Sequence, residues 1–287
     1  MSAPPNEKEL RKRIDAAAAR RSVAPGRLHY TVASTIALQM VPPGAAKGGG
    51  GVRQRVDERA ARLTNDLDFA RPSAMSLNDF VDAFADRLEA GWADFTGIVK
   101  AGRKATPEAV PDEYVMDPFR IALRYRGKSY YSVTFELGHS EIGSGDRPVE
   151  RLGTDIAEIF AEVGLPEPMP VPVITAEDQI VQKIHACTCP TADGRPNERA
   201  HDLVDIQILA AVEDLDYAVI ADLGARLFAY RRRHEWPPDL IVHEGWESLY
   251  AQARADLVDS TVLDDVNDAA DFVRQIIGRA AGTQRTS

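Results

Sequence analysis

A proline-rich segment divides this chain into two parts with different sequence patterns. Its prolines stand at every second position from Pro166 to Pro172, which excludes a helix because proline lacks the N–H group and clashes with the preceding turn. Helix-forming stretches and short strands alternate before this segment, whereas the pattern after it is helical almost throughout. We therefore predict an α+β fold, with a mixed sheet and helices over residues 1–165 and a mainly helical half over 166–287.

The predicted elements follow from apolar periodicity and from residues that start or stop helices. Before the prolines, helices are predicted at 7–21, 27–40, 53–63, 77–90 and 154–163, with a strand at 66–70 and a hairpin over 121–137. After the prolines, helices are predicted at 175–187, 199–212, 216–234, 244–257 and 264–281.

Charge and the N-terminal sequence limit the class of protein. A net charge of −10 argues against binding nucleic acid by bulk electrostatics but leaves local contacts possible. Positive side chains cluster at Arg53, Arg55, Arg59 and Arg62, and again over 231–234. Each cluster could receive phosphate or form a solvated helix face. No apolar h-region or stop-transfer segment is present, so we expect a cytoplasmic protein with no membrane partner.

Two cysteines, Cys187 and Cys189, are present in the chain. A pair this close cannot supply a disulfide framework. Two thiols with the nearby His185 also leave a tetrahedral metal site incomplete. We therefore expect these thiols to be buried or idle.

Two aspartates one residue apart, Asp66 and Asp68, stand within a short apolar segment. In an extended strand they point to one face, while Leu67 and Phe69 point to the other face and into a core. Two adjacent carboxylates repel each other, and a divalent cation such as Mg²⁺ would relieve that repulsion. The alternative is a plain turn, since Asn-Asp is also common in loops.

A run of four glycines follows Lys47 and precedes the aspartate pair by about a helix length. Without side chains, Gly48 and Gly49 would let a phosphate-bearing ligand approach the backbone closely. A flexible linker is the alternative, and no Gly-Lys-Ser/Thr closes a Walker A loop. In the predicted hairpin, Glu136 lies on the polar strand face, either as a third carboxylate for a metal or as an exposed side chain.

Three charged residues recur at helical spacing in the second part. Asp202 and Asp205 lie three residues apart and share a helix face, where they repel unless a cation lies against them. Arg199, one turn before Asp202, could be that cation. These residues therefore form either part of a site or an ion-pair network.

Four motifs in order resemble one family. They are Lys47-Gly48-Gly49; Arg62-x-Thr64-x-Asp66-Leu67-Asp68; Thr175-x-Glu177-x-x-Ile180-x-x-Lys183-Ile184-x-Ala186; and Arg199-x-x-Asp202-Leu203-x-Asp205-Ile206. This order and spacing, from about Arg27 to Leu209, resembles the AbiEii/AbiGii nucleotidyltransferase-type toxins of the DNA polymerase β-like nucleotidyltransferase superfamily.

The resemblance implies a nucleotidyltransferase core followed by a helical half that contributes to the active site. It implies a toxin of a toxin–antitoxin or phage-defence system, with an AbiEi-type antitoxin as partner, which transfers nucleotides from an NTP to the acceptor end of tRNA. Asp66 and Asp68 would carry Mg²⁺ and Lys183 would contact the triphosphate. Asp202 or Asp205 would be a further acidic residue of the site.

Nucleotide contacts are expected from the remaining motif residues, which are Lys47, Gly48, Gly49, Arg62, Thr64 and Arg199. One departure from the family pattern concerns the position after the paired glycines, where the family has Thr or Ser and this chain has Gly50 and Gly51. Two alternatives therefore stay open. The acidic net charge is consistent with transfer to a protein hydroxyl, and the altered glycine loop with a nucleotide- or antitoxin-binding module of weak catalysis.

Overall fold

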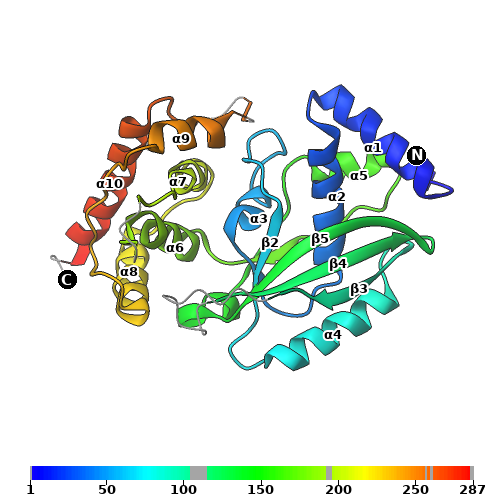
Figure 1. Cartoon of the computed structure of the whole chain (residues 1–287), viewed down its shortest axis with the longest axis horizontal. Coiled ribbons are helices and arrows are strands. Elements are labelled where there is room, and N and C mark those ends of the chain that lie inside the picture. The colour runs from blue at the N-terminus through cyan, green and yellow to red at the C-terminus, as the bar shows by residue number, and fades with distance from the viewer. Residues whose placement is uncertain (1, 104–114, 192–195, 256, 259–260, 285–287) are drawn as a thin grey trace. The chain divides into compact units, whose positions relative to one another are not determined.

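The computed structural model describes residues 2–103, 115–191, 196–255, 257–258 and 261–284 (Figure 1). The chain forms two compact units. The first comprises 1–58 and 63–173, and the second comprises 59–62 and 174–287. The boundary after Val173 lies eight residues beyond the end of the region predicted from the proline-rich segment, because the last of those residues form a strand of the first unit's sheet.

A mixed seven-stranded sheet forms the centre of the first unit, with the strand order β3-β4-β5-β2-β1-β7-β6. Its strands are β1 (Ala45–Ala46), β2 (Asp66–Ala70), β3 (Phe95–Ala101), β4 (Asp117–Tyr125), β5 (Lys128–Gly138), β6 (Val149–Arg151) and β7 (Val171–Val173). The predicted strand at 66–70 and the predicted hairpin are confirmed as β2, β4 and β5. The short β1, β6 and β7 and the strand β3 were not predicted.

Helices of the first unit are α1 (Glu7–Arg21), α2 (Pro25–Gln39), α3 (Gly48–Arg53), α4 (Leu77–Ala90) and α5 (Ile156–Val163). Local signals explain where several of them begin. The Ser76 side chain accepts a hydrogen bond from the Asp79 N–H and caps α4, and Asn6 caps α1 in the same way. Pro25, at the first position of α2, begins that helix rather than only ending the previous one.

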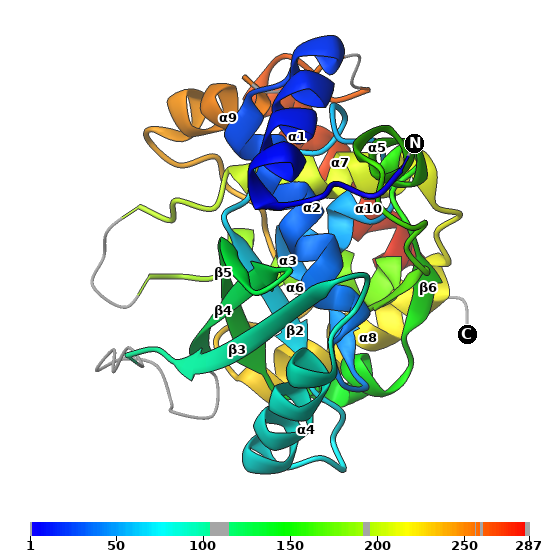
Figure 2. The ribbon, with the colours of Figure 1, turned by 90° about the vertical axis from the view of Figure 1, so that its right-hand side faces the viewer.

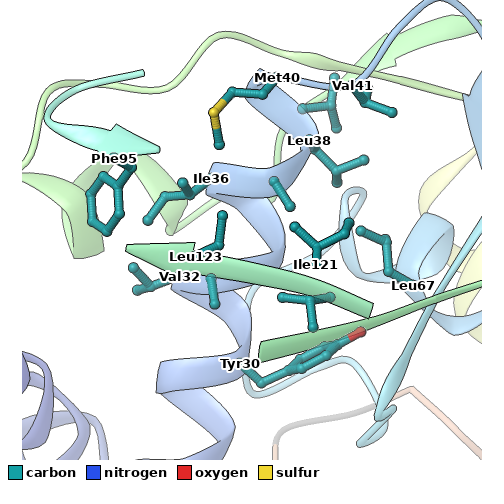
Figure 3. Packing of buried hydrophobic residues seen from close by; sticks show 14 of the residues in the cluster. Tyr30, Val32, Ile36, Leu38, Met40, Val41, Leu67, Phe95, Ile121 and Leu123 are labelled. Carbon is teal, nitrogen blue, oxygen red and sulfur yellow. The ribbon is translucent and has the colours of Figure 1, made fainter. Parts of the chain in front are cut away.

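One apolar face of the sheet packs against helices α2 and α4. Leu123 on β4 lies beside the α2 residues Val32 and Ile36 (Figure 3), and Ile121 on β4 and Leu67 on β2 belong to the same cluster. From α4, Phe84 meets Phe135 of β5 with ring centroids 5.4 Å apart. Figure 2 shows α4 running alongside β3. The strand residues between these apolar ones, which point to the opposite face, are mostly polar.

The helix predicted over 53–63 is wrong. A helix instead begins inside the glycine run and ends at Arg53, and turns follow it. Residues 54–63 have good helix propensity, but Arg53 and Glu58 are both buried and are joined to each other and to α2 by hydrogen bonds. Tertiary contacts to charged groups thus outweigh a local preference of a few tenths of a kcal/mol per residue.

The described part of the second unit is helical, as predicted. Its helices are α6 (Ala176–Thr188), α7 (His201–Val212), α8 (Tyr217–Arg231), α9 (Trp246–Arg254) and α10 (Val266–Gln284). Thr175 caps α6 by accepting a hydrogen bond from the Asp178 N–H, and Asp216 caps α8. The predicted α+β class, a mixed sheet followed by helices, is therefore confirmed. Within the described residues, no helix combines the length and apolarity that crossing a membrane requires.

Candidate active site

The paired aspartates lie side by side on the polar face of β2. Asp66 and Asp68 are half-buried, whereas Leu67 and Phe69 between and after them are buried in the core. The alternation predicted from the sequence is therefore confirmed, and the turn alternative is wrong. The sheet holds both carboxylates on one surface because successive strand side chains point to opposite faces.

A third carboxylate, that of Glu136, lies next to the pair. Strands β2 and β5 run parallel with Asp68 opposite Glu136 and Asp66 opposite Thr134. Burial, followed by repulsion from Asp68 and Asp66, raises the pKa of the Glu136 carboxyl, while Lys47 opposes this rise. The strand register thus concentrates negative charge that a cation would stabilise.

Lys47 and Gly48 lie beside Asp68. The backbone N–H of Lys47 donates to the carbonyl oxygen of Asp68 over 2.9 Å. Gly48 has a φ of +59°, and a Cβ atom placed there would lie 1.9 Å from Oδ2 of Asp68. At the end of β5, a Cβ atom on Gly138 would lie 3.2 Å from the Lys47 Nζ. The glycine run is therefore folded against the aspartates, and the linker alternative is wrong.

These carboxylates provide the donors that Mg²⁺ requires. Among the described residues, no group of three or more His, Cys, Asp or Glu side chains is arranged to hold a metal ion unaided. Mg²⁺ usually binds one or two carboxylates and completes its shell with water and substrate phosphate oxygens. Asp66 and Asp68, with Glu136 adjacent and a Cβ-free backbone at Gly48, fit that mode of binding.

Two further residues of the first unit interact with Asp66 and Asp68, either by a hydrogen bond or electrostatically. The Thr64 hydroxyl donates to the carbonyl oxygen of Asp66 over 3.3 Å, which holds the turn before β2. The Tyr30 hydroxyl on α2 is buried and has no hydrogen-bond partner among the described residues. Burial raises the pKa of Tyr30, and the charges of Asp68 and Asp66 add to this rise. Sequence reasoning missed Tyr30, because only its tertiary position relates it to the aspartates.

The first arginine cluster is not an open phosphate-binding face. Arg53 and Arg55 are buried, with 1% and 7% exposure. The Arg53 Nη1 donates to both carboxylate oxygens of Glu58, and the Arg55 Nη1 donates to the Gly51 carbonyl oxygen. The predicted alternatives, phosphate reception and a solvated helix face, are both wrong for these two residues. Of the second cluster, Arg232 and Arg233 are exposed.

Five predicted site residues form one ion-pair network in the second unit, with Lys183, Asp202 and Asp205 buried and Arg199 partly exposed. The Lys183 Nζ donates to Asp202 over 3.0 Å and to Asp205 over 2.5 Å. Arg199 donates to Asp202 over 2.7 Å, and Arg62 to Asp205 over 2.8 Å. Both aspartates are fully buried. Helices α6 and α7 and the segment 59–62 are thereby tied together, and the predicted pairing of Arg199 with Asp202 is part of this network.

Three cations keep the two buried aspartates ionised. Burial alone would raise the pKa of the Asp202 carboxyl, but Lys183 and Arg199 outweigh it and hold that pKa below its usual range. For Asp205, Arg62 and Lys183 likewise lower the pKa against the effect of burial. Two of the three ammonium donors of Lys183 are used here, so a role for Lys183 in nucleotide binding stays a prediction.

His201 provides a test of this network through pH. Burial lowers the pKa of His201 to about 4, although Asp202 opposes the change. An unfolded chain binds that proton near pH 6.5, so the unfolded state holds more protons between about pH 6.5 and about pH 4. We expect the free energy of unfolding of the second unit to decrease as pH falls through this window, with His201 contributing up to about 3 kcal/mol.

The measurement uses 5-fluorotryptophan and ¹⁹F NMR in urea, because Trp236 and Trp246 belong to the second unit and Trp92 to the first. His201→Gln should lose less stability than the wild type between about pH 7 and about pH 4.5. His243→Gln, in the same unit, should lose as much as the wild type. An equal loss in the His201 variant would contradict the assignment.

Of the two thiols, Cys187 is buried and Cys189 is partly exposed, and both are free. Burial raises the pKa of Cys187 well above its usual range. Cys187 is therefore an inert thiol, which confirms the expectation that it is buried or idle.

Comparison with known proteins places these residues in context. A family model described as "Nucleotidyl transferase AbiEii toxin, Type IV TA system" matches residues 47–272, most of the chain. The fold is similar to that of MenT4, a nucleotidyltransferase toxin from Mycobacterium tuberculosis, with 15% sequence identity, a TM-score of 0.52 and coverage of 94% of this chain and 98% of that chain. JHP933 from Helicobacter pylori has 12% identity, a TM-score of 0.45 and coverage of 92% and 97%, respectively. No match is found among curated proteins.

Proposed function

Because this chain belongs to the AbiEii nucleotidyl transferase toxin family of type IV toxin–antitoxin systems, we propose that it transfers nucleotides from an NTP to the 3′ acceptor end of tRNA and thereby blocks translation. The carboxylates of Asp66, Asp68 and Glu136, gathered on one sheet face beside Lys47 and Gly48, carry this proposal. Membership in the family implies an antitoxin partner, which we propose is of the AbiEi type, and a role in phage defence is consistent with it.

The proposed reaction is an in-line displacement at the α-phosphorus. The 3′ hydroxyl gives up its proton to an acceptor, a nearby carboxylate or water, and its oxygen forms the new bond to the α-phosphorus. The bond from the α-phosphorus to the oxygen that bridges it to the β-phosphate breaks, and pyrophosphate leaves. Bound Mg²⁺, held by Asp66 and Asp68 with Glu136 adjacent, would neutralise charge on the attacking and leaving oxygens. Lys47 brings a point charge to the same surface, and the bare backbone at Gly48 and Gly49 leaves room for phosphate.

The second network has a separate proposed role. Lys183 keeps one ammonium donor beyond its two carboxylate partners, and we propose that this donor contacts a phosphate oxygen of the NTP. Asp202 and Asp205 would then position and polarise that lysine. Arg62 and Arg199 each donate to the aspartate oxygen that Lys183 does not contact. We therefore propose that their main role is to hold Asp205 and Asp202 in place, and that any contact with nucleotide is secondary.

Labelled nucleotides test the proposed function. The protein is incubated with each α-³²P-labelled NTP, total RNA and cell protein, with Mg²⁺ or with excess EDTA. Label from the α-³²P NTP should enter RNA of tRNA size in the Mg²⁺ sample and not in the EDTA sample. Label from a γ-³²P NTP should not enter RNA, because the γ-phosphate leaves with pyrophosphate. RNA oxidised with periodate, which destroys the 3′ diol, should accept no label.

Other outcomes of this experiment identify the alternatives. Label in polypeptide rather than RNA would favour transfer to a protein hydroxyl, which the net charge of −10 makes the second candidate. No label in either, with NTP still bound, would indicate a binding module without catalysis. Transfer that persists in EDTA would reject the metal requirement.

Gly48→Ala tests whether close approach to Asp68 matters for transfer. The new Cβ would lie 1.9 Å from Oδ2 of Asp68, so the carboxylate must move. A shift of about 1 Å in a reacting group can cost about 10²-fold in rate, and we expect a loss of that size. The measurement is the initial rate of label transfer at saturating NTP.

Gly127→Ala is the matched control for this variant. Gly127 also has a positive φ, +77°, but a Cβ there would meet nothing within 4 Å. Both variants should lose about 1–2 kcal/mol of stability from backbone strain. Only Gly48→Ala should lose activity, and equal activity in the two variants would reject the role of the carboxylate contact.

A further inference from the structure

Positive side chains line the same sheet face as the carboxylates, two and three strands away. The register of the four strands places Lys100, Arg120, Thr134 and Asp66 in one row across β3, β4, β5 and β2. Adjacent strands lie about 4.8 Å apart, so this row spans about 14 Å from Lys100 to Asp66. Residues paired in a sheet share a face, and the cations are therefore on the surface that carries the active-site carboxylates.

A second cation extends this surface along β4. Arg124 lies four residues from Arg120 on the same side of the strand, or about 13 Å along it. Between them, Ala122 faces Ser132 of β5. Ala122 and Ser132 carry small side chains, and Arg120 and Arg124 on either side of Ala122 are exposed.

The cations are exposed and available. Lys100, Arg120 and Arg124 are all exposed. Their backbones pair within the sheet, but none of the three side chains forms an ion pair or hydrogen bond with another residue in the described part of the chain. At the hairpin turn, in contrast, Arg126 is paired with Asp94 over 2.9 Å. On a chain of net charge −10, unpaired positive charge on one face is a specific placement rather than a reflection of composition.

We propose that this basic face, defined by Lys100, Arg120 and Arg124, binds the phosphate backbone of the RNA whose 3′ end reaches Asp66 and Asp68. This inference rests on the proposed function and identifies where the acceptor lies. The spacing favours a polymer, since cations about 13 Å apart require an anion that repeats phosphates over that length. An NTP with its α-phosphorus at the carboxylates would have to extend across two or three strands to reach these cations, whereas an RNA chain spans that length readily.

Charge reversal tests the proposal in the full-length protein. Arg120→Glu/Arg124→Glu is compared with the wild type in binding a fluorescein-labelled tRNA acceptor hairpin with a single-stranded 3′ end, by anisotropy at several NaCl concentrations. We expect at least about tenfold weaker binding and a salt slope shallower by about 1.4, the value for two single-strand phosphate contacts. The KM for NTP in transfer should stay at the wild-type value.

Two control variants make the result specific. Lys8→Glu/Lys12→Glu reverses two exposed charges on α1 and should bind RNA almost as the wild type does. Arg120→Lys/Arg124→Lys keeps the charges and should retain most of the binding. Equal loss in the α1 variant would show a general charge effect and overturn the proposal.

The outcomes separate this inference from the proposed function. If the wild type labels no RNA, the proposed function fails whatever the variants do. If the wild type labels RNA and the Arg120/Arg124 variant binds it with an unchanged salt slope, only the basic face is rejected. A variant that loses NTP affinity and keeps RNA affinity would assign the face to the nucleotide, which also overturns the inference.

Discussion

Asp68→Asn should lower nucleotide transfer at least about 10³-fold, the scale of loss on removing a group that stabilises transition-state charge. Asp68 has neighbours from both other parts of the site. Its carboxylate is opposite Glu136 in the sheet and within reach of the bare backbone at Gly48. Asparagine has nearly the same shape, so the change removes negative charge and leaves packing in place.

The free energy of unfolding of Asp68→Asn should not fall together with its activity. The charge of Asp68 contributes to the raised pKa of Glu136, which shows that the carboxylates repel in the folded protein. Neutralising one of them relieves this repulsion, so the variant should be as stable as the wild type or slightly more stable. If Asp68 had only a structural role, removing its charge would instead lower the stability of the protein.

The measurements are single-turnover transfer of α-³²P label and urea unfolding followed by the fluorine signal of Trp92. Glu150→Gln, on an exposed strand position of the same unit, is the control and should match the wild type in both. Relief of toxicity in cells should accompany the loss of transfer. Full toxicity of the Asp68→Asn variant at equal expression would contradict the assignment of Asp68 to the active site.

Glu58→Gln should destabilise the first unit by about 3–5 kcal/mol, the cost of breaking a buried ion pair. Glu58 has a fully buried side chain. It accepts a hydrogen bond from Arg27 over 2.5 Å and two from Arg53, over 2.9 and 2.8 Å, and a fourth from the Thr31 hydroxyl over 2.5 Å. Glutamine preserves the volume but removes the negative charge that both buried guanidinium groups contact.

This network also supports the active site. Arg53 is the last residue of α3, and Gly48, the first residue of the same helix, lies against Asp68. Loosening the Arg53 end of α3 frees its Gly48 end to shift. We therefore expect Glu58→Gln to reduce transfer as well as stability, even where the protein remains folded.

The fluorine signal of Trp92 reports the unfolding of the first unit, while Trp236 and Trp246 report the second and should change little. Glu158→Gln removes an exposed carboxylate of the first unit, with a side chain 79% exposed and 3.5 Å from Arg21. It should cost about 1 kcal/mol or less. A loss for Glu58→Gln no larger than this control would show that the network contributes little.

Much of the secondary structure and one part of the site were predictable from local sequence. The alternation of Asp66 to Phe69 placed two carboxylates on a polar strand face, and the capping residues Ser76 and Thr175 marked the starts of α4 and α6. Such features depend on neighbours within a few residues. The motif order was sufficient to identify the family, which the match over 47–272 confirms.

The predictions that failed concern segments whose structure depends on residues far away in the sequence. Good helix formers over 53–63 predicted a helix, yet Arg53 and Glu58 were instead placed by contacts with Arg27 and Thr31. The strand β3 was missed because residues such as Thr96, Gly97 and Lys100 give a weak strand signal on their own, and only pairing with β4 fixes it.

By itself, the sequence determined the strand with its two aspartates, every long helix and the family, but not the short helix α3. Only the tertiary structure decided that Glu136 stands opposite Asp68, that Gly48 touches its carboxylate and that Lys100 and Arg120 share its face. The reason is physical. Local periodicity states which side of a strand a residue takes, whereas the register between strands is set by burial of whole faces over long sequence separations.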